Sequence, residues 1–110
     1  MREIKAYIKE HKLDAVVLAL HKLEELPGFS VVEVRGCGSQ HIEDGVICQM
    51  DDLVKHAKIE IVCKDSQAES IISVIEKAAH TGLRGDGKIY VSTIDTAVSI
   101  QTGERGEHII

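Results

Sequence analysis

The chain has 110 residues and a net charge of −5, and 44% of its residues are apolar but only 3% are aromatic. This length allows one domain with a single core, which must be built from aliphatic side chains. The acidic balance and the lack of a cluster of Lys and Arg argue against direct binding of nucleic acid. No apolar run approaches the roughly 18 residues of a membrane span, and the N-terminus has the pattern of a strand and not of a signal peptide. We therefore expect a cytoplasmic protein without membrane insertion.

The first half of the chain shows a strand, a helix and a second strand. Residues 2–9 alternate, as in a strand with one buried face. Apolar residues then recur at helical spacing until the Pro-Gly pair at 27–28 ends the helix; they are Leu13, Val16, Val17, Leu20 and Leu23. Residues 30–35 alternate again, with Val32 and Val34 on one face.

The second half repeats this order. Residues 57–63 alternate as a third strand, and a capping box at Ser66 and Glu69 opens a helix whose apolar stripe is Ala68, Ile71, Ile72, Ile75 and Ala79. Residues 89–94 are a fourth strand, and 97–101 are a candidate for a short fifth. The order β-α-β-β-α-β predicts a ferredoxin-like α+β sandwich, with two helices on one face of an antiparallel sheet.

The other face of this predicted sheet must be covered or remain in water. Val31 and Val62 are expected to point outward from the second and third strands. Apolar side chains in these places favour burial of the free face against another subunit. We treat residues 1–110 as one domain.

A glycine-rich loop separates the second helix from the fourth strand, and it reads Thr81-Gly82-Leu83-Arg84-Gly85-Asp86-Gly87-Lys88. Glycine reaches backbone angles that are closed to other residues, so the loop can point successive N–H groups at one anion, and Lys88 adds a positive charge. A Walker loop runs from a strand into a helix, whereas this loop leaves the electronegative end of a helix, so loop amides and Lys88 alone would hold a phosphate. On this view Gly87→Ala would abolish binding without unfolding the protein, because its Cβ would lie where the backbone approaches phosphate. The alternative is a plain glycine cap at Gly82 followed by a tight turn, and the spacing alone leaves both open.

This loop, together with Ile100-Gln101-Thr102-Gly103-Glu104, resembles the PII nitrogen-regulatory signal-transduction family. The opening run at 4–9, the turn at 34–38 and the run at 58–62 also match, so the resemblance covers nearly the whole chain outside 41–57. It implies a non-catalytic homotrimer that binds ATP or ADP, with or without Mg²⁺, in clefts between subunits. The residues that would contact the nucleotide are Gly36, Cys37 and Gly38 beside the base and ribose, and Gly85, Asp86, Gly87 and Lys88 around the phosphates.

Residues 37–56 are expected to form a long loop, which the resemblance identifies as the partner-docking T-loop of the family. The implied partner is a protein, such as an enzyme or a membrane transporter. Gln40 matches the glutamine that helps to hold magnesium and 2-oxoglutarate, whereas His56 stands where the family has a lysine that pairs with 2-oxoglutarate. The only tyrosines, Tyr7 and Tyr90, lie in predicted strands, so uridylylation of a loop tyrosine is excluded.

Three further positions depart from the resemblance, because Ser39, Ser99 and Gln101 stand where arginines are expected. Each charge-assisted contact is worth roughly 1.5–3 kcal/mol, so their loss should weaken the binding of a triphosphate. The preference among ATP, ADP and AMP is therefore open.

The long loop also suggests an alternative function. His41, Cys48 and His56 carry the imidazole and thiolate groups that bind zinc and copper, as expected of a metal-responsive, CutA-like trimer. Their spacing matches no closed zinc pattern, and such residues can occur in a loop by chance. The three cysteines are too widely spaced for a disulfide framework.

Overall fold

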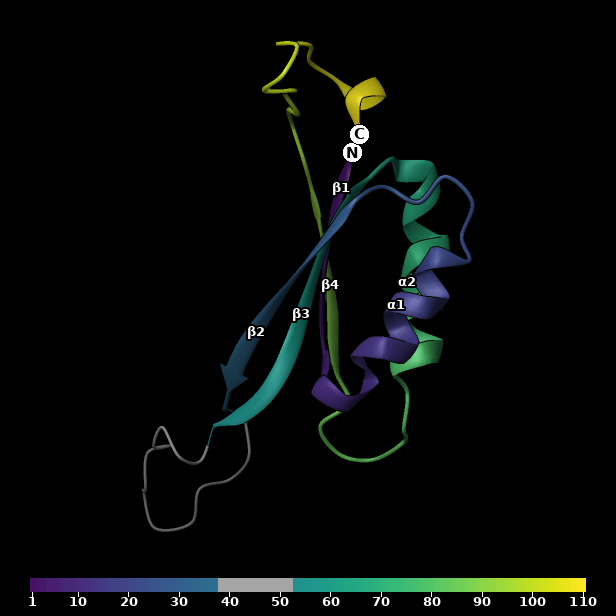
Figure 1. Cartoon of the computed structure of the whole chain (residues 1–110), viewed down its shortest axis with the longest axis vertical. Coiled ribbons are helices and arrows are strands. Elements are labelled where there is room, and N and C mark those ends of the chain that lie inside the picture. Colours follow the sequence, from purple (N-terminus) through teal and green to yellow (C-terminus); the bar gives the residue numbers. More distant parts are fainter. Residues whose placement is uncertain (38–52) are drawn as a thin grey trace.

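A computed structural model of the chain describes residues 1–37 and 53–110 (Figure 1). Four strands form one antiparallel sheet in the order β2-β3-β1-β4, and both helices lie on the same side of it. The strands are β1 (Arg2–Lys9), β2 (Phe29–Gly36), β3 (Val54–Cys63) and β4 (Gly87–Thr93). The helices are α1 (Leu13–His21) and α2 (Asp65–Ala79), and short 3-10 turns follow β1 (Glu10–Lys12) and end the chain (Glu107–Ile109). The predicted ferredoxin-like α+β fold is confirmed.

The core lies between the sheet and the helices and is aliphatic, as the composition predicts. In β1, Ile4, Ala6 and Ile8 are buried, and their partners in β3 are the equally buried Ile61, Ile59 and Ala57. The helices close the core with Val16, Leu20, Ala68, Ile71, Ile75 and Ala79. Apolar residues alternate in the strands and recur at helical spacing in α2. Each element thus turns one apolar face into the core between the sheet and the helices.

The predicted start of α2 was wrong by a few residues. The helix begins at Asp65, and the side-chain oxygen of Gln67 accepts a hydrogen bond of 3.1 Å from the N–H of Lys64. The amide of Gln67 also donates to the carbonyl of Glu25, at 3.0 Å, where the backbone is left-handed with φ of 56°. Gln67 therefore caps α2 and fixes the turn that follows α1. The helix α1 ends at His21, before the predicted end near the Pro-Gly pair, and the next N–H groups, those of Lys22 and Leu23, donate to carbonyls three residues back.

The strand β2 presents the opposite face from the one predicted. Phe29 pairs with Ile61 and Val31 pairs with Ile59, so Val31 lies on the helix side at the sheet edge, where it remains 41% exposed. Val32 and Val34 pair with Lys58 and His56 and face away from the helices. The outward position predicted for Val31 was thus wrong.

We call the side of the sheet without helices the open face. Its centre is charged, with ion pairs of 3.2 Å between Lys5 and Glu3 and of 2.8 Å between Lys58 and Glu60. The second pair lowers the pKa of Glu60 and raises that of Lys58, mainly through their side-chain hydrogen bond. Apolar and aromatic side chains flank these charges, namely Val32, Val34, Val62, Tyr7 and Tyr90. The two tyrosine rings pack edge to face with centroids 6.0 Å apart.

The segment after β4 forms a tight reversal instead of the predicted fifth strand. Only one isolated bridge, between Val98 and Arg105, occurs there in the described residues. The N–H of Ser99 donates to the carbonyl of Glu104, and that of Gly103 donates to the carbonyl of Ser99, each at 2.8 Å. We call residues 97–106 the C-terminal turn. In the part of the chain that the structure describes, no helix has the length and apolar character to cross a membrane.

Candidate functional site at one end of the sheet

The glycine-rich loop begins where α2 ends. The N–H of His80 still donates to the carbonyl of Glu76, at 3.1 Å, but His80 itself is extended with ψ of 127°. Gly82, Gly85 and Gly87 then have φ of 79°, 88° and 102°, which L side chains rarely adopt. The glycines therefore let the chain turn back from α2 into β4 within seven residues (80–86).

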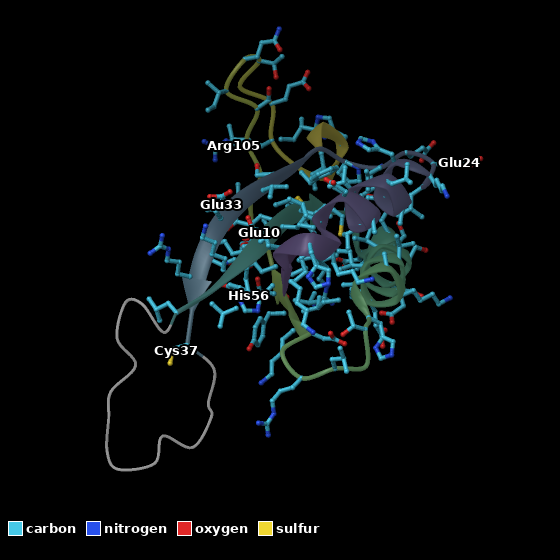
Figure 2. The ribbon with its side chains drawn as sticks, turned by 60° about the horizontal axis from the view of Figure 1, so that its bottom comes forward. Glu10, Glu24, Glu33, Cys37, His56 and Arg105 are labelled. Carbon is cyan, nitrogen blue, oxygen red and sulfur yellow. The ribbon has the colours of Figure 1, made fainter. Side chains whose placement is uncertain are left out.

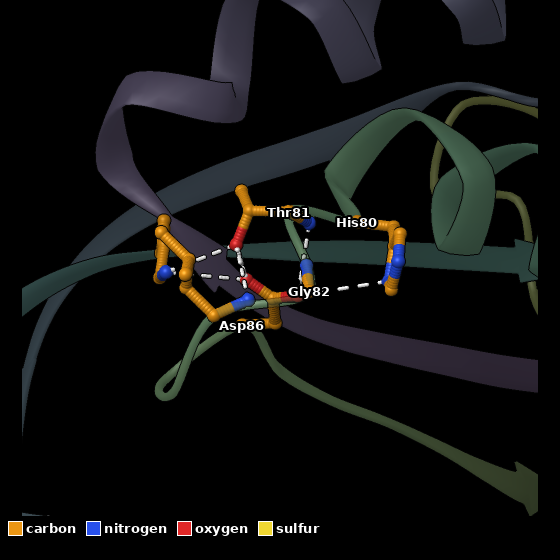
Figure 3. Close-up of polar contacts among 6 residues, drawn as sticks. His80, Thr81, Gly82 and Asp86 are labelled. Carbon is orange, nitrogen blue, oxygen red and sulfur yellow. Dashed lines mark hydrogen bonds and ion pairs between the residues drawn. The ribbon is translucent and has the colours of Figure 1, made fainter.

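One carboxylate, that of Asp86, organises this loop (Figure 3). Its Oδ2 accepts hydrogen bonds of 2.9 Å from the N–H groups of both Thr81 and Gly82. Its Oδ1 accepts the hydroxyl proton of Thr81 and pairs with the ammonium of Lys9, at 3.2 Å. His80 adds its Nδ1 at 3.7 Å from Oδ2. These contacts join the two ends of the loop to each other and to β1.

The donors around Asp86 lower its pKa far below the usual range, with the Thr81 hydroxyl contributing most, followed by the Thr81 N–H. Burial acts in the opposite direction but does not prevail. Asp86 is therefore ionised at neutral pH, and its negative charge is balanced by Lys9 and by the hydrogen-bond donors of the loop. The predicted contact of Asp86 with phosphate stays a prediction, and in this geometry its carboxylate faces the loop's own donors.

Gly87 is required by the sheet itself. A Cβ at this position would lie 1.7 Å from the carbonyl oxygen of Tyr7 and 2.8 Å from its carbonyl carbon, both in the neighbouring β1. The geometry opposes the expectation that the fold survives Gly87→Ala, because the new atom would collide with backbone and disturb the pairing of β4 with β1. That the substitution abolishes binding stays a prediction. Lys88 and Gly85 are the positions of this loop at which a phosphate contact can be tested.

Lys88 follows directly in β4 and differs from Lys9 in its electrostatic state. Its register partner is Tyr7, so Lys88 belongs to the open face, where it is exposed. Among the described residues no ion pair of Lys88 is found, whereas Lys9 is paired with Asp86. A shallow hollow of about 330 Å³ lies beside the loop between α2 and β4, and its lining includes Ile72, His80, Asp86, Gly87 and Lys88.

The second predicted group lies at the end of β2. Gly36 pairs with Val54, and a Cβ on Gly36 would have His56 Nδ1 as its nearest neighbour, at 4.0 Å. His56 lies in β3 and pairs with Val34 of β2. The loop therefore ends before Val54 and not at His56 as predicted. Figure 2 shows Cys37 and His56 at the same end of the molecule. The structure thus brings Gly36, Cys37 and His56 close together.

The two predicted groups lie at the same end of the sheet but on opposite edges. His56 of β3 pairs with Lys9 of β1, and the preceding Ile8 pairs with Gly87 of β4, so Gly36 and Lys88 both lie toward this end. The strands β3 and β1 stand between β2 and β4, which separates the two edges by about 14 Å at the usual spacing of strands. Within one chain, the two groups do not meet.

Comparison with known proteins identifies the family of this fold and loop. A family model described as nitrogen regulatory protein P-II matches residues 1–104. The chain belongs to this family. The nitrogen regulatory protein P-II of Azospirillum brasilense is 46% identical over 110 residues, which are 96% of each chain, and that of Rhodospirillum rubrum gives the same values. The P-II protein of Cereibacter sphaeroides is 41% identical over the full length of both chains.

Two of the positions at which the family resemblance leads us to expect arginine, Ser99 and Gln101, lie in the C-terminal turn. The hydroxyl oxygen of Ser99 accepts a hydrogen bond of 3.3 Å from the N–H of Thr102, and Gln101 is exposed. Figure 2 shows Arg105 of this turn at the opposite end of the molecule from Cys37. These two positions therefore lie away from the glycine-rich loop of their own chain.

Several predicted positions fall outside the described residues, namely Gly38, Ser39, Gln40, His41 and Cys48. For the metal site this leaves only His56, whose Nδ1 lies 3.3 Å from the carbonyl of Val54. Over residues 1–37 and 53–110, no group of three or more His, Cys, Asp or Glu side chains could hold a metal ion. The comparisons give the metal-responsive alternative no support either.

Sequence reasoning missed Lys9 and the hydroxyl of Thr81 as parts of the site. Thr81 was visible as part of the motif, and its spacing of five residues from Asp86 was the available signal. The contact between Lys9 and Thr81 spans 72 residues of sequence, so only the fold reveals it.

Proposed function

We propose that this P-II protein is a non-catalytic cytoplasmic regulator that binds ATP or ADP between neighbouring copies of the chain and acts on a protein partner through its long loop. One observation carries the proposal. The two groups expected to hold a nucleotide occupy the same end of the sheet on opposite edges. A neighbouring copy that presents its β2 edge to the β4 edge of the first would bring Gly36 and Lys88 together, and repetition of this contact closes a ring.

The state of the loop charges supports phosphate as the ligand group at the β4 edge. Lys9 is neutralised by Asp86, but Lys88 lies exposed beside Gly87 and Gly85. An ammonium next to backbone with positive φ is suited to bind an oxyanion. The β2 edge offers Gly36, whose lack of a side chain leaves room for a flat base or a ribose.

The open face supports assembly. It carries balanced charges in its centre and partly exposed Val32, Val34 and Val62 around them. A second copy could cover these apolar side chains and pair with the charges, and we propose the homotrimer that the family resemblance implies.

The regulatory role is supported by the family and by the names of the relatives, which are called nitrogen regulatory proteins. We propose that the partner is a protein, with an enzyme or a membrane transporter as candidates. Residues 37–56, which the sequence predicts to form the docking loop, begin at the β2 edge next to the proposed site, so an occupied site lies beside the base of the loop. This arrangement suits a nucleotide-dependent switch.

Calorimetric titration with ATP and ADP tests the nucleotide site. The wild-type protein is expected to bind at least one of them with micromolar to millimolar affinity, and Lys88→Ala should weaken binding about tenfold or more, because a charge-assisted contact is lost. Lys22→Ala serves as the matched control, since this exposed lysine follows α1 and takes no part in the site. Absence of binding at millimolar nucleotide, or equal effects of the two substitutions, would contradict the proposal.

A further inference from the structure

The groups around Asp86 form a site that fits an anion. Two consecutive N–H groups, those of Thr81 and Gly82, converge on one oxygen at 2.9 Å, and the hydroxyl of Thr81 and the ammonium of Lys9 face the other. Figure 3 shows Thr81 and Gly82 beside the Asp86 side chain, with dashed lines that mark the contacts of its carboxylate. Amides, a hydroxyl and an ammonium are the donors with which proteins hold phosphate. We call these four groups the Asp86 nest.

The position of the carboxylate needs an explanation, because α2 directs its electronegative end toward the loop. A negative charge is disfavoured there unless other groups offset it. Lys9 supplies a full positive charge at 3.2 Å, and the donors keep the pKa of Asp86 well below its ordinary value. The nest is therefore filled by a charge that belongs to the loop itself.

Two lysines border the loop, Lys9 and Lys88, and only Lys9 belongs to the nest. Lys9 is mostly buried and is neutralised by Asp86, whereas Lys88 is exposed. We propose that Asp86 is an internal anion that occupies the nest, closes it to external phosphate and directs such a ligand to Lys88. Asp86 would thus determine the specificity of the loop without touching the ligand.

Removal of this charge should open the nest. Asp86→Ala removes the carboxylate oxygens that fill the nest and leaves Lys9 without its anion, so inorganic phosphate can enter. The inference refines the proposed nucleotide site, but phosphate binding by this variant does not depend on nucleotide binding by the wild type. A failure of one can therefore be distinguished from a failure of the other.

The experiment is a calorimetric titration of inorganic phosphate into four proteins: wild type, Asp86→Ala, Asp86→Ala with Lys9→Met, and Asp95→Ala as the matched control. Asp95 is an exposed aspartate in the segment after β4. Asp86→Ala should bind phosphate about tenfold tighter than the wild type, the double variant should lose this gain, and Asp95→Ala should match the wild type. If folded Asp86→Ala binds phosphate no tighter, or if the double variant keeps the gain, the proposal is overturned.

A second measurement uses the wild type and covers the case in which Asp86→Ala does not fold. Amide chemical shifts are followed while phosphate is added to high millimolar concentration. The Thr81 and Gly82 amides should remain unchanged, because Asp86 already accepts their hydrogen bonds. Phosphate-dependent shifts of both amides would show that the nest is open in the wild type and would refute the proposal.

Discussion

The two faces of the sheet are made by the same four strands but have opposite chemistry. Toward the helices, Ile4, Ile59 and Ile61 are at most 1% exposed, and no polar side chain is buried among the described residues. The open face carries two ion pairs and several partly exposed valines and tyrosines. The helix side thus accounts for the stability of the chain, whereas the open face and the sheet edges are available for assembly and ligands. The following substitutions test this division.

The largest effect is expected where β4 touches β1. Gly87→Ala places a Cβ 1.7 Å from the carbonyl oxygen of Tyr7, so the strands must separate, and we expect a loss of more than about 4 kcal/mol or no folded protein. Gly28→Ala is the control, because a Cβ there meets nothing within 4 Å. Urea unfolding followed by circular dichroism measures both. Wild-type stability of Gly87→Ala would show that the β1–β4 pairing is not as described.

A truncation in the core should have the next largest effect. Ile59→Ala removes a fully buried side chain from the centre of β3 and should cost about 2–5 kcal/mol. Its cross-strand partner Val31 is 41% exposed, so Val31→Ala should cost about 1 kcal/mol or less. Equal losses in the free energy of unfolding would contradict the difference in burial between these neighbours.

The open face should respond to charge at the level of assembly. Val32→Asp replaces a valine that is 44% exposed in the single chain, and a buried carboxylate in its place would oppose association. We expect light scattering to show a trimer for the wild type and particles that approach the 12.1 kDa chain for this variant. Leu18→Asp, on the outer side of α1 and 61% exposed, should remain assembled. Dissociation by Leu18→Asp alone would place the interface on the helix side.

The smallest effect is expected within the charged centre of the open face. Lys58→Met removes one partner of a partly exposed ion pair, and such pairs contribute little because water and salt screen them. The free energy of unfolding of the single chain should stay within experimental error of the wild type. A loss as large as that of Ile59→Ala would mean that the open face also stabilises the chain.

The order of the elements could be predicted because apolar residues alternate in β1 and β3 and recur at helical spacing in α2. The orientation of β2 could not, because Val31, Val32 and Val34 make both of its faces apolar, and only pairing with β3 decides between them. The loop motif indicated Gly85 and Lys88 as candidates. The close approach of Gly87 to the carbonyl of Tyr7 and the contact of Lys9 with Thr81 join segments that are distant in sequence. Sequence patterns could therefore not reveal them.

The most direct test of the central claim is complementation between two defective chains. Lys88→Ala impairs the β4 edge, and Gly36→Leu impairs the β2 edge at a position where nothing lies closer than 4.0 Å to a new Cβ. If each site combines the β4 edge of one copy with the β2 edge of the next, mixed assemblies made by refolding the two variants together regain about one quarter of the intact sites. Calorimetry with ATP or ADP should then detect tight sites that neither variant shows alone. A mixture that binds no better than the average of the two variants, while wild type binds fully, would contradict a site shared between copies.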